Sequence, residues 1–196
     1  MTRTACCGLP LIFVLACATT PMHAAVPHDA AASGAALWAD ADEHSQLAFD
    51  RPQQVLQALD RHLLVTPAGT ADWRVLVRSR GTVAAAGNRP AEAESAAQAL
   101  ATAGPLGEAD AALVRSVMAD VTGASPLAIE AAEDAIARYA QACPASPGAC
   151  DPRAAWLAQQ TLARHLLYQG KVTLARKSAL AAAELALKAQ DGARQA

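Results

Sequence analysis

Apolar and polar residues follow one another along most of the chain with the spacing of amphipathic helices. Near the C-terminus, Leu180, Ala183 and Leu187 share one helical face, whereas charged residues share another, with Glu184 and Lys188 spaced i,i+4. Glycine and proline divide the chain into helix-length runs, and no segment has a convincing strand pattern. Abundant alanine and few aromatic residues agree with this pattern, which predicts an all-α protein.

The predicted helices form four pairs, each joined by a short turn. Asp50 is expected to cap the second helix of the first pair. Ser125 and Asp151 are expected to cap later helices, each followed by a proline at the first helical position. The pairs are predicted to span residues 35–65, 72–103, 107–142 and 151–190.

The turns within the pairs repeat at a spacing typical of tetratricopeptide units, which are about 34 residues long. Gly87 and Gly123 lie 36 residues apart, and Gly170 follows after 47, with an inserted loop between them. An alanine stands five residues after two of these glycines, at Ala128 and Ala175. A small residue there lets the second helix of a pair approach the first, so the pattern predicts a repeat.

The repeat is degenerate. Glu92 stands where the small residue is expected in the second pair, one residue out of register with Ala91 and Ala93, and the first pair lacks the glycine. We therefore predict antiparallel helix pairs stacked as a short, right-handed, tetratricopeptide-like solenoid. An irregular alanine-rich helical bundle is the alternative.

The first residues are typical of a secretory leader. Arg3 precedes an apolar run that is too short to span a membrane, and small residues follow up to a cleavage site after Ala24. Pro10 and Pro21 argue against a buried N-terminal helix. The sequence thus predicts a signal peptide over residues 1–24, a flexible linker over 25–34 and a helical repeat domain over 35–196. No later segment is apolar enough to cross a membrane.

A second processing route is open at Cys17. Val14-Leu15-Ala16-Cys17 is similar to a bacterial lipobox, in which the cysteine is lipidated. Simple cleavage predicts a periplasmic or secreted protein, which we favour, and lipidation predicts one anchored at Cys17.

Two cysteines, Cys143 and Cys150, lie outside the leader. An even pair, close in sequence in an exported protein, predicts a disulfide, which would stabilise the fold by roughly 2–3 kcal/mol. A metal site is the rival interpretation, but no histidine or second cysteine pair lies nearby.

Charge and motifs limit the functions. The formal net charge of −2 becomes −3 without Arg3, and no block of like charges exists, which argues against nucleic acid and anionic lipid as partners. No catalytic motif or phosphate-binding loop is present, and no cofactor or metal is predicted. Asp40 and His44 have a metal-binding spacing but lack further ligands. His165 is expected to be a surface or half-buried residue.

Stacked helix pairs curve, and their first helices line the concave face. Five arginines fall on such helices, and together they would suit an acidic peptide or a carboxylate. The candidate groove-lining residues are Arg74, Arg78, Arg115, Arg153 and Arg164.

The disulfide loop is the most distinctive motif: Cys143-Pro-Ala-Ser-Pro-Gly-Ala-Cys150-Asp-Pro-Arg-Ala-Ala-Trp156. An exported, alanine-rich, tetratricopeptide-like chain with such a loop resembles the periplasmic input regions of membrane-bound diguanylate cyclases, the GGDEF-domain proteins. The resemblance covers most of the residues after the leader. In that family a membrane helix and a cytoplasmic cyclase follow the helices. Neither is found in this sequence, so the resemblance transfers no catalytic residue.

We therefore expect a non-catalytic periplasmic binding or sensory module that takes a peptide or protein ligand and is an input region separated from its cyclase. A free-standing secreted or lipid-anchored scaffold of the cell envelope is the second hypothesis. A helical-bundle enzyme is the third.

Overall fold

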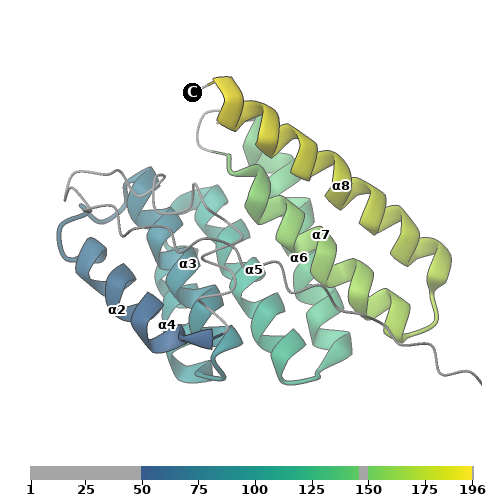
Figure 1. Ribbon diagram of the computed structural model, residues 1–196, viewed down its shortest axis with the longest axis horizontal. Helices are drawn as coiled ribbons and strands as arrows, with labels where there is room; N and C mark the ends of the chain where they lie inside the picture. The colour runs from purple at the N-terminus through teal and green to yellow at the C-terminus, as the bar shows by residue number, and fades with distance from the viewer. Residues whose placement is uncertain (1–49, 146–149, 196) are drawn as a thin grey trace, which may run out of the picture. The chain divides into compact units, whose positions relative to one another are not determined.

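The computed structural model describes residues 50–145 and 150–195, and these are almost entirely helical (Figure 1). Within these ranges there is no strand, which confirms the all-α prediction. A short 3-10 helix, Cys143–Ala145, follows the fifth of the seven α-helices found in the described part of the chain. Their bounds are α2 Pro52–Leu63, α3 Ala71–Ala86, α4 Pro90–Ala101, α5 Gly104–Val121, α6 Ser125–Ala142, α7 Pro152–Tyr168 and α8 Val172–Gln195.

Several predictions lie outside the described residues. These are the leader with Cys17, the linker, and the first helix of the first pair with Asp40 and His44. The described residues all belong to one compact unit. None of the described helices is long and apolar enough to cross a membrane.

Three helix ends differ from the predictions. Arg51 occupies the cap position of α2 without a side-chain hydrogen bond, so the prediction for Asp50 is wrong. The third pair begins at Gly104 instead of near Gly107, because Pro105 fits the first turn of α5 and does not end a helix there. The last helix continues past Asp191-Gly192 to Gln195, at a cost of about 1 kcal/mol for an interior glycine.

One turn geometry recurs in the three complete helix pairs. Asn88, Gly123 and Gly170 each have positive φ, at 56°, 73° and 73°. In each turn the next residue's N–H donates to the carbonyl five residues earlier, at 2.9 Å in every case. This pattern is the Schellman motif, in which a left-handed residue ends the helix and satisfies its last carbonyl groups.

Counted from the left-handed residue, the small residue of the second pair has the same spacing as in the other two pairs. The left-handed residue is Asn88 and not Gly87, because a short polar side chain also tolerates positive φ. Counting five residues from each left-handed position gives Ala93, Ala128 and Ala175, which are all buried. Glu92 is therefore not a departure from the repeat.

The first helices of these pairs, α3, α5 and α7, are here called the A helices, and their partners α4, α6 and α8 the B helices. Each A helix packs against its own B helix, and α5 and α7 also pack against both helices of the preceding pair. The colour order in Figure 1 follows this succession from α2 to α8. Alanine dominates the contacts, so the helices approach closely and each residue buries little area.

Three helices approach one another closely at Gly81 of α3. A Cβ built at this position would lie 2.9 Å from Val114 Cγ2 of α5 and 3.0 Å from Ala96 Cβ of α4. Glycine is required here by the space between three helices, since the backbone itself is ordinary helix.

We predict that Gly81→Ala lowers the free energy of unfolding by about 1–3 kcal/mol, because the new methyl group overpacks the junction. Urea denaturation measures the change. Val114→Ala should recover part of the loss, so the double variant should be less destabilised than the sum of the two single changes. Strict additivity would show that the contact with Val114 is not the cause.

Candidate binding site

A buried ionic cluster lies where the helix pairs meet. Asp110 of α5 is at its centre, with a side chain only 1% exposed. Arg74 Nε pairs with Asp110 Oδ2 at 2.9 Å, and Arg78 Nη1 donates to Oδ1 at 3.1 Å. The Tyr139 hydroxyl of α6 donates to the same Oδ1 at 2.5 Å. Side chains of α3, α5 and α6 thus meet on one carboxylate.

Asp151 extends the cluster to α7. Its Oδ1 accepts from the Arg153 backbone N–H at 2.9 Å, which confirms Asp151 as the cap of α7, and its Oδ2 pairs with Arg78 Nη2. Two arginines are thereby balanced by two aspartates. Because isolated charges are costly to bury, this balance is a condition for the cluster to exist.

Burial and charge shift two pKa values in the cluster. Burial raises the pKa of Tyr139 well above its ordinary value of 10.0, and the negative charge of Asp110 raises it further. Burial alone would lower the pKa of Arg78, but the carboxylates of Asp110 and Asp151 more than offset this, so it rises. Tyr139 therefore remains a donor and Arg78 a cation at every physiological pH.

The disulfide holds the start of α7 beside this cluster. Cys143 follows α6 directly, Cys150 precedes Asp151, and the two form a disulfide with a Cα–Cα distance of 5.3 Å. The predicted pairing of these cysteines is confirmed. Both also pack against the main hydrophobic core. The disulfide therefore helps to place Asp151 next to Arg78.

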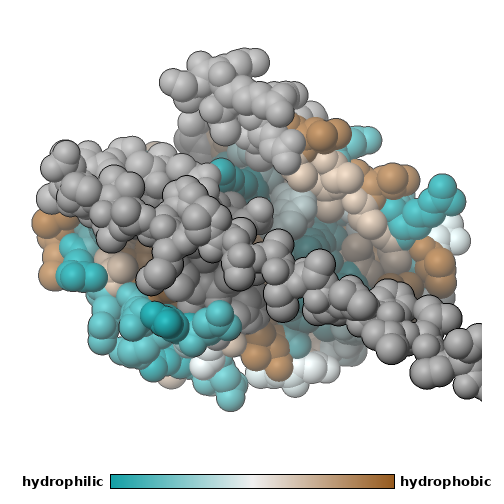
Figure 2. Space-filling model, in the orientation of Figure 1, coloured by the Kyte–Doolittle hydropathy of each residue, from teal (hydrophilic) through white to brown (hydrophobic). Residues whose placement is uncertain are grey.

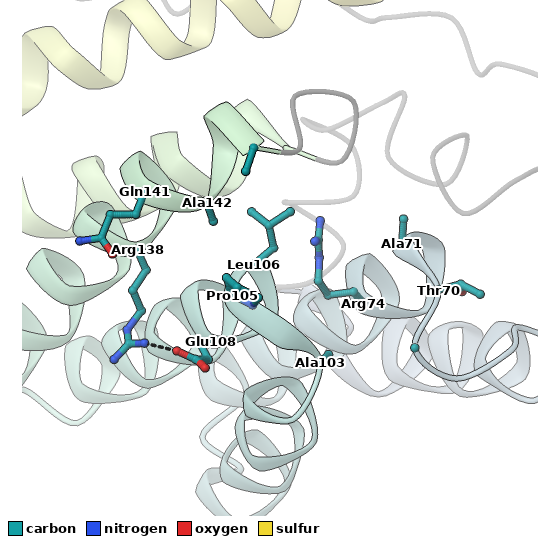
Figure 3. A pocket seen from close by; sticks show the side chains of 12 residues that line it. Thr70, Ala71, Arg74, Ala103, Pro105, Leu106, Glu108, Arg138, Gln141 and Ala142 are labelled. Atoms are coloured by element: carbon teal, nitrogen blue, oxygen red, sulfur yellow. Dashed lines mark hydrogen bonds and ion pairs between the residues drawn. The ribbon is translucent and has the colours of Figure 1, made fainter.

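A pocket of about 580 Å³ opens beside the cluster (Figure 3). It lies between the N-terminal ends of α3 and α5 and the C-terminal end of α6. Figure 3 shows the Arg74 side chain near Leu106, whereas the ion pair of Glu108 with Arg138 lies at the far side. The lining residues are Gly69, Thr70, Ala71, Arg74, Ala103, Pro105, Leu106, Glu108, Arg138, Gln141, Ala142 and Ala145.

The pocket combines small and apolar groups with charged ones, which are Arg74 and the Glu108–Arg138 ion pair. Arg74 is 7% exposed and held in position by Asp110, so its orientation is set before any ligand arrives. The N-terminal ends of α3 and α5 add partial positive charge, and α5 has no side-chain cap at Ala103. Such a site suits a carboxylate or another small anion with an apolar neighbour.

No protein-family model, no curated protein and no solved structure matches this chain.

The structure places the five candidate arginines in different surroundings. Arg74 and Arg78 share the ionic cluster, and Arg74 alone lines the pocket. Arg115 pairs with Glu94 of α4 at 3.0 Å, and Arg164 pairs with Asp120 of α5 at 2.5 Å. Arg153 is half-buried in the first turn of α7. We keep the prediction of acidic-ligand binding for Arg74, because it is the one of these five arginines that lines the pocket.

A second cluster was missed by sequence reasoning. His165 is 2% exposed, with Nε2 at 2.7 Å from Asp120 Oδ1 and Nδ1 at 2.9 Å from Ser125 Oγ. Ser125, expected to cap α6, is instead its first residue, after Ala124 at the cap position. No local sequence pattern marks this contact, since His165 and Asp120 lie 45 positions apart.

The second cluster places serine, histidine and aspartate in one chain of contacts, as hydrolases do. Its position indicates a structural role instead, because it links α7 to α5 and α6. Arg164 occupies the second oxygen of Asp120, and none of the three residues lines the pocket. Within residues 50–145 and 150–195, no three His, Cys, Asp or Glu side chains group closely enough to hold a metal ion.

We predict that Asp110→Asn lowers the free energy of unfolding by about 3–5 kcal/mol, because it leaves two arginines in a buried site with one carboxylate. Asp134→Asn is the matched control. Asp134 forms an exposed ion pair with Arg138, so its loss should cost less than about 1 kcal/mol. Equal effects in urea denaturation would contradict the central role of Asp110.

The Glu94–Arg115 pair predicts a pH dependence. The hydrogen bond from Arg115 holds the pKa of Glu94 below its ordinary value of 4.5. Stability from this pair is therefore present above pH 4.5 and is lost as the pH falls through the lowered folded-state pKa. Glu94→Gln should be less stable than the parent at neutral pH, and the difference should vanish at lower pH. A difference that persists in acid would argue against the ion pair as its source.

Proposed function

We propose that this chain is a non-catalytic helical-repeat binding module whose pocket takes an acidic group of a peptide or protein ligand. The observation that carries the proposal is the position of Arg74. It is a buried arginine, oriented by Asp110, that lines a pocket otherwise walled largely by small and apolar groups at the ends of two A helices. A carboxylate there would meet an oriented guanidinium and two helix N-termini.

The pairs are proposed to be tetratricopeptide-like units in a right-handed solenoid. Their shared Schellman turns and their buried alanines five residues later support this assignment. A small residue also stands seven positions before each left-handed residue, at Gly81, Ser116 and Ala163. Tetratricopeptide units place a glycine on the first helix and an alanine on the second, where the helices cross.

The proposed site of action is the periplasm or the cell exterior. The leader pattern supports this location, and disulfides are typical of oxidising compartments. The resemblance to input regions of diguanylate cyclases supports a sensory role, in which ligand occupancy of the pocket is the signal. A free-standing envelope scaffold would use the same pocket, so the binding experiment tests the feature common to both.

The test compares two alanine-rich peptides that differ only in a free C-terminal carboxylate or an amide. We predict that the chain binds the carboxylate peptide about tenfold more tightly. Arg74→Lys should remove most of this preference, because lysine keeps the charge but loses the planar guanidinium. Isothermal titration calorimetry measures the affinities.

Arg80→Lys is the matched control on the same helix. Arg80 pairs with Asp60 and Glu92 and does not line the pocket, so its replacement should leave the preference unchanged. Unfolding curves of both variants establish that they fold. Equal affinity for the two peptides, or a folded Arg74→Lys variant that binds like the parent, would refute the proposal.

A further inference from the structure

The pocket has charged groups at two ends, and the balance of charge differs between them. In Figure 3, Arg74 lies at one end and the Glu108–Arg138 ion pair at the other, with Pro105 and Leu106 between. At the first end, the two arginines of the cluster are matched by two aspartates, and the N-terminal ends of α3 and α5 add partial positive charge. The far end has an excess of negative charge instead.

Arg138 at the far end faces two carboxylates. Its Nε donates to both oxygens of Asp134, at 2.9 and 2.8 Å, and its Nη1 pairs with Glu108 Oε2. Hydrogen bonding to Asp134, together with the negative charges of Asp134 and Glu108, raises the pKa of Arg138, so this side chain stays a cation. One cation and two carboxylates leave one negative charge at this end of the pocket.

Glu108 is the carboxylate that presents this charge to the pocket. It lines the pocket, whereas Asp134 does not. Glu108 meets Arg138 through one oxygen, Oε2, and its side chain is 48% exposed, which leaves Oε1 able to accept a hydrogen bond from a ligand. An ammonium or guanidinium group is the donor that a carboxylate binds most strongly. The far end of the pocket therefore suits a cationic group.

The size of the pocket limits a peptide ligand to a few residues. A volume of about 580 Å³ is within the range of small-molecule sites, and an extended chain advances about 3.3–3.6 Å per residue. Apolar contacts alone do not select such a ligand, because apolar side chains are exposed elsewhere too. Figure 2 shows them along α8, where Leu180 and Leu187 are 57% and 62% exposed. The charges at the two ends distinguish the pocket from such surfaces.

We propose that the pocket takes a dipolar ligand, with a carboxylate at Arg74 and an ammonium or guanidinium group at Glu108. The inference rests on the proposed binding of an acidic group at Arg74 and adds the charge required at the other end. A peptide with a lysine or arginine just before its C-terminal carboxylate has this chemistry. A short free peptide has it too, through its N-terminal ammonium group.

Two series of short, alanine-rich peptides with free C-terminal carboxylates test this proposal. In the first, the N-terminus is acetylated, and lysine or norleucine stands at the second or third position from the end. In the second, tri-alanine is compared with its acetylated form. Isothermal titration calorimetry should show about two- to fivefold tighter binding of the member with the ammonium group, and the series that shows this preference identifies the source of the cation.

Two protein variants identify the contact, and their unfolding curves establish that they fold. Glu108→Gln should abolish the preference, because it removes the charge and keeps the size of the side chain. Glu94→Gln removes the same charge from α4, outside the pocket lining, and should preserve the preference.

Equal binding of the charged and uncharged members in both series, or a preference that Glu108→Gln leaves unchanged, would overturn the proposal. The carboxylate and amide peptides that test Arg74 separate this failure from a failure of the proposed function. A carboxylate preference without an ammonium preference would overturn only the dipolar ligand.

Discussion

The carboxylate of Asp110 is the point on which the arrangement of the helix pairs depends. It lies in an alanine-rich interior that buries little apolar area per residue. A charge buried there is tolerated only when opposite charges and hydrogen bonds offset its desolvation cost. Arg74, Arg78 and Tyr139 supply that compensation from two other helices, and Asp151 balances the second arginine. The cluster therefore determines which surfaces of α3, α5, α6 and α7 face one another, in a core where small side chains specify orientation weakly.

The disulfide and the pocket both follow from this cluster. The Cys143–Cys150 loop places Asp151 at the cap of α7 and against Arg78, so one residue ends a loop, begins a helix and neutralises a buried cation. Arg74 contributes to the same network and also lines the pocket. An arginine that is oriented by the fold loses little conformational freedom when it binds a ligand, which is why a stable buried network and a binding site can share a residue.

Small residues set the spacing of the helices and repeat with the turns. The Schellman motif fixes where each A helix ends and thus the register at which the B helix begins. Ala93, Ala128 and Ala175 then fall at the same crossing in the three complete pairs, and Gly81 admits a close contact between three helices.

Within the described residues, local residue patterns predicted the helices and the disulfide, because helical periodicity, proline positions and cysteine spacing act over a few residues. The left-handed conformation of Asn88 is not predicted by the sequence pattern, because glycine is the usual residue at positive φ. The partners of the arginines and of His165 could not be derived, because Arg78–Asp110 and His165–Asp120 join residues 32 and 45 positions apart. Only the packing of one pair on the next decides which charged side chains meet and which of them line a pocket.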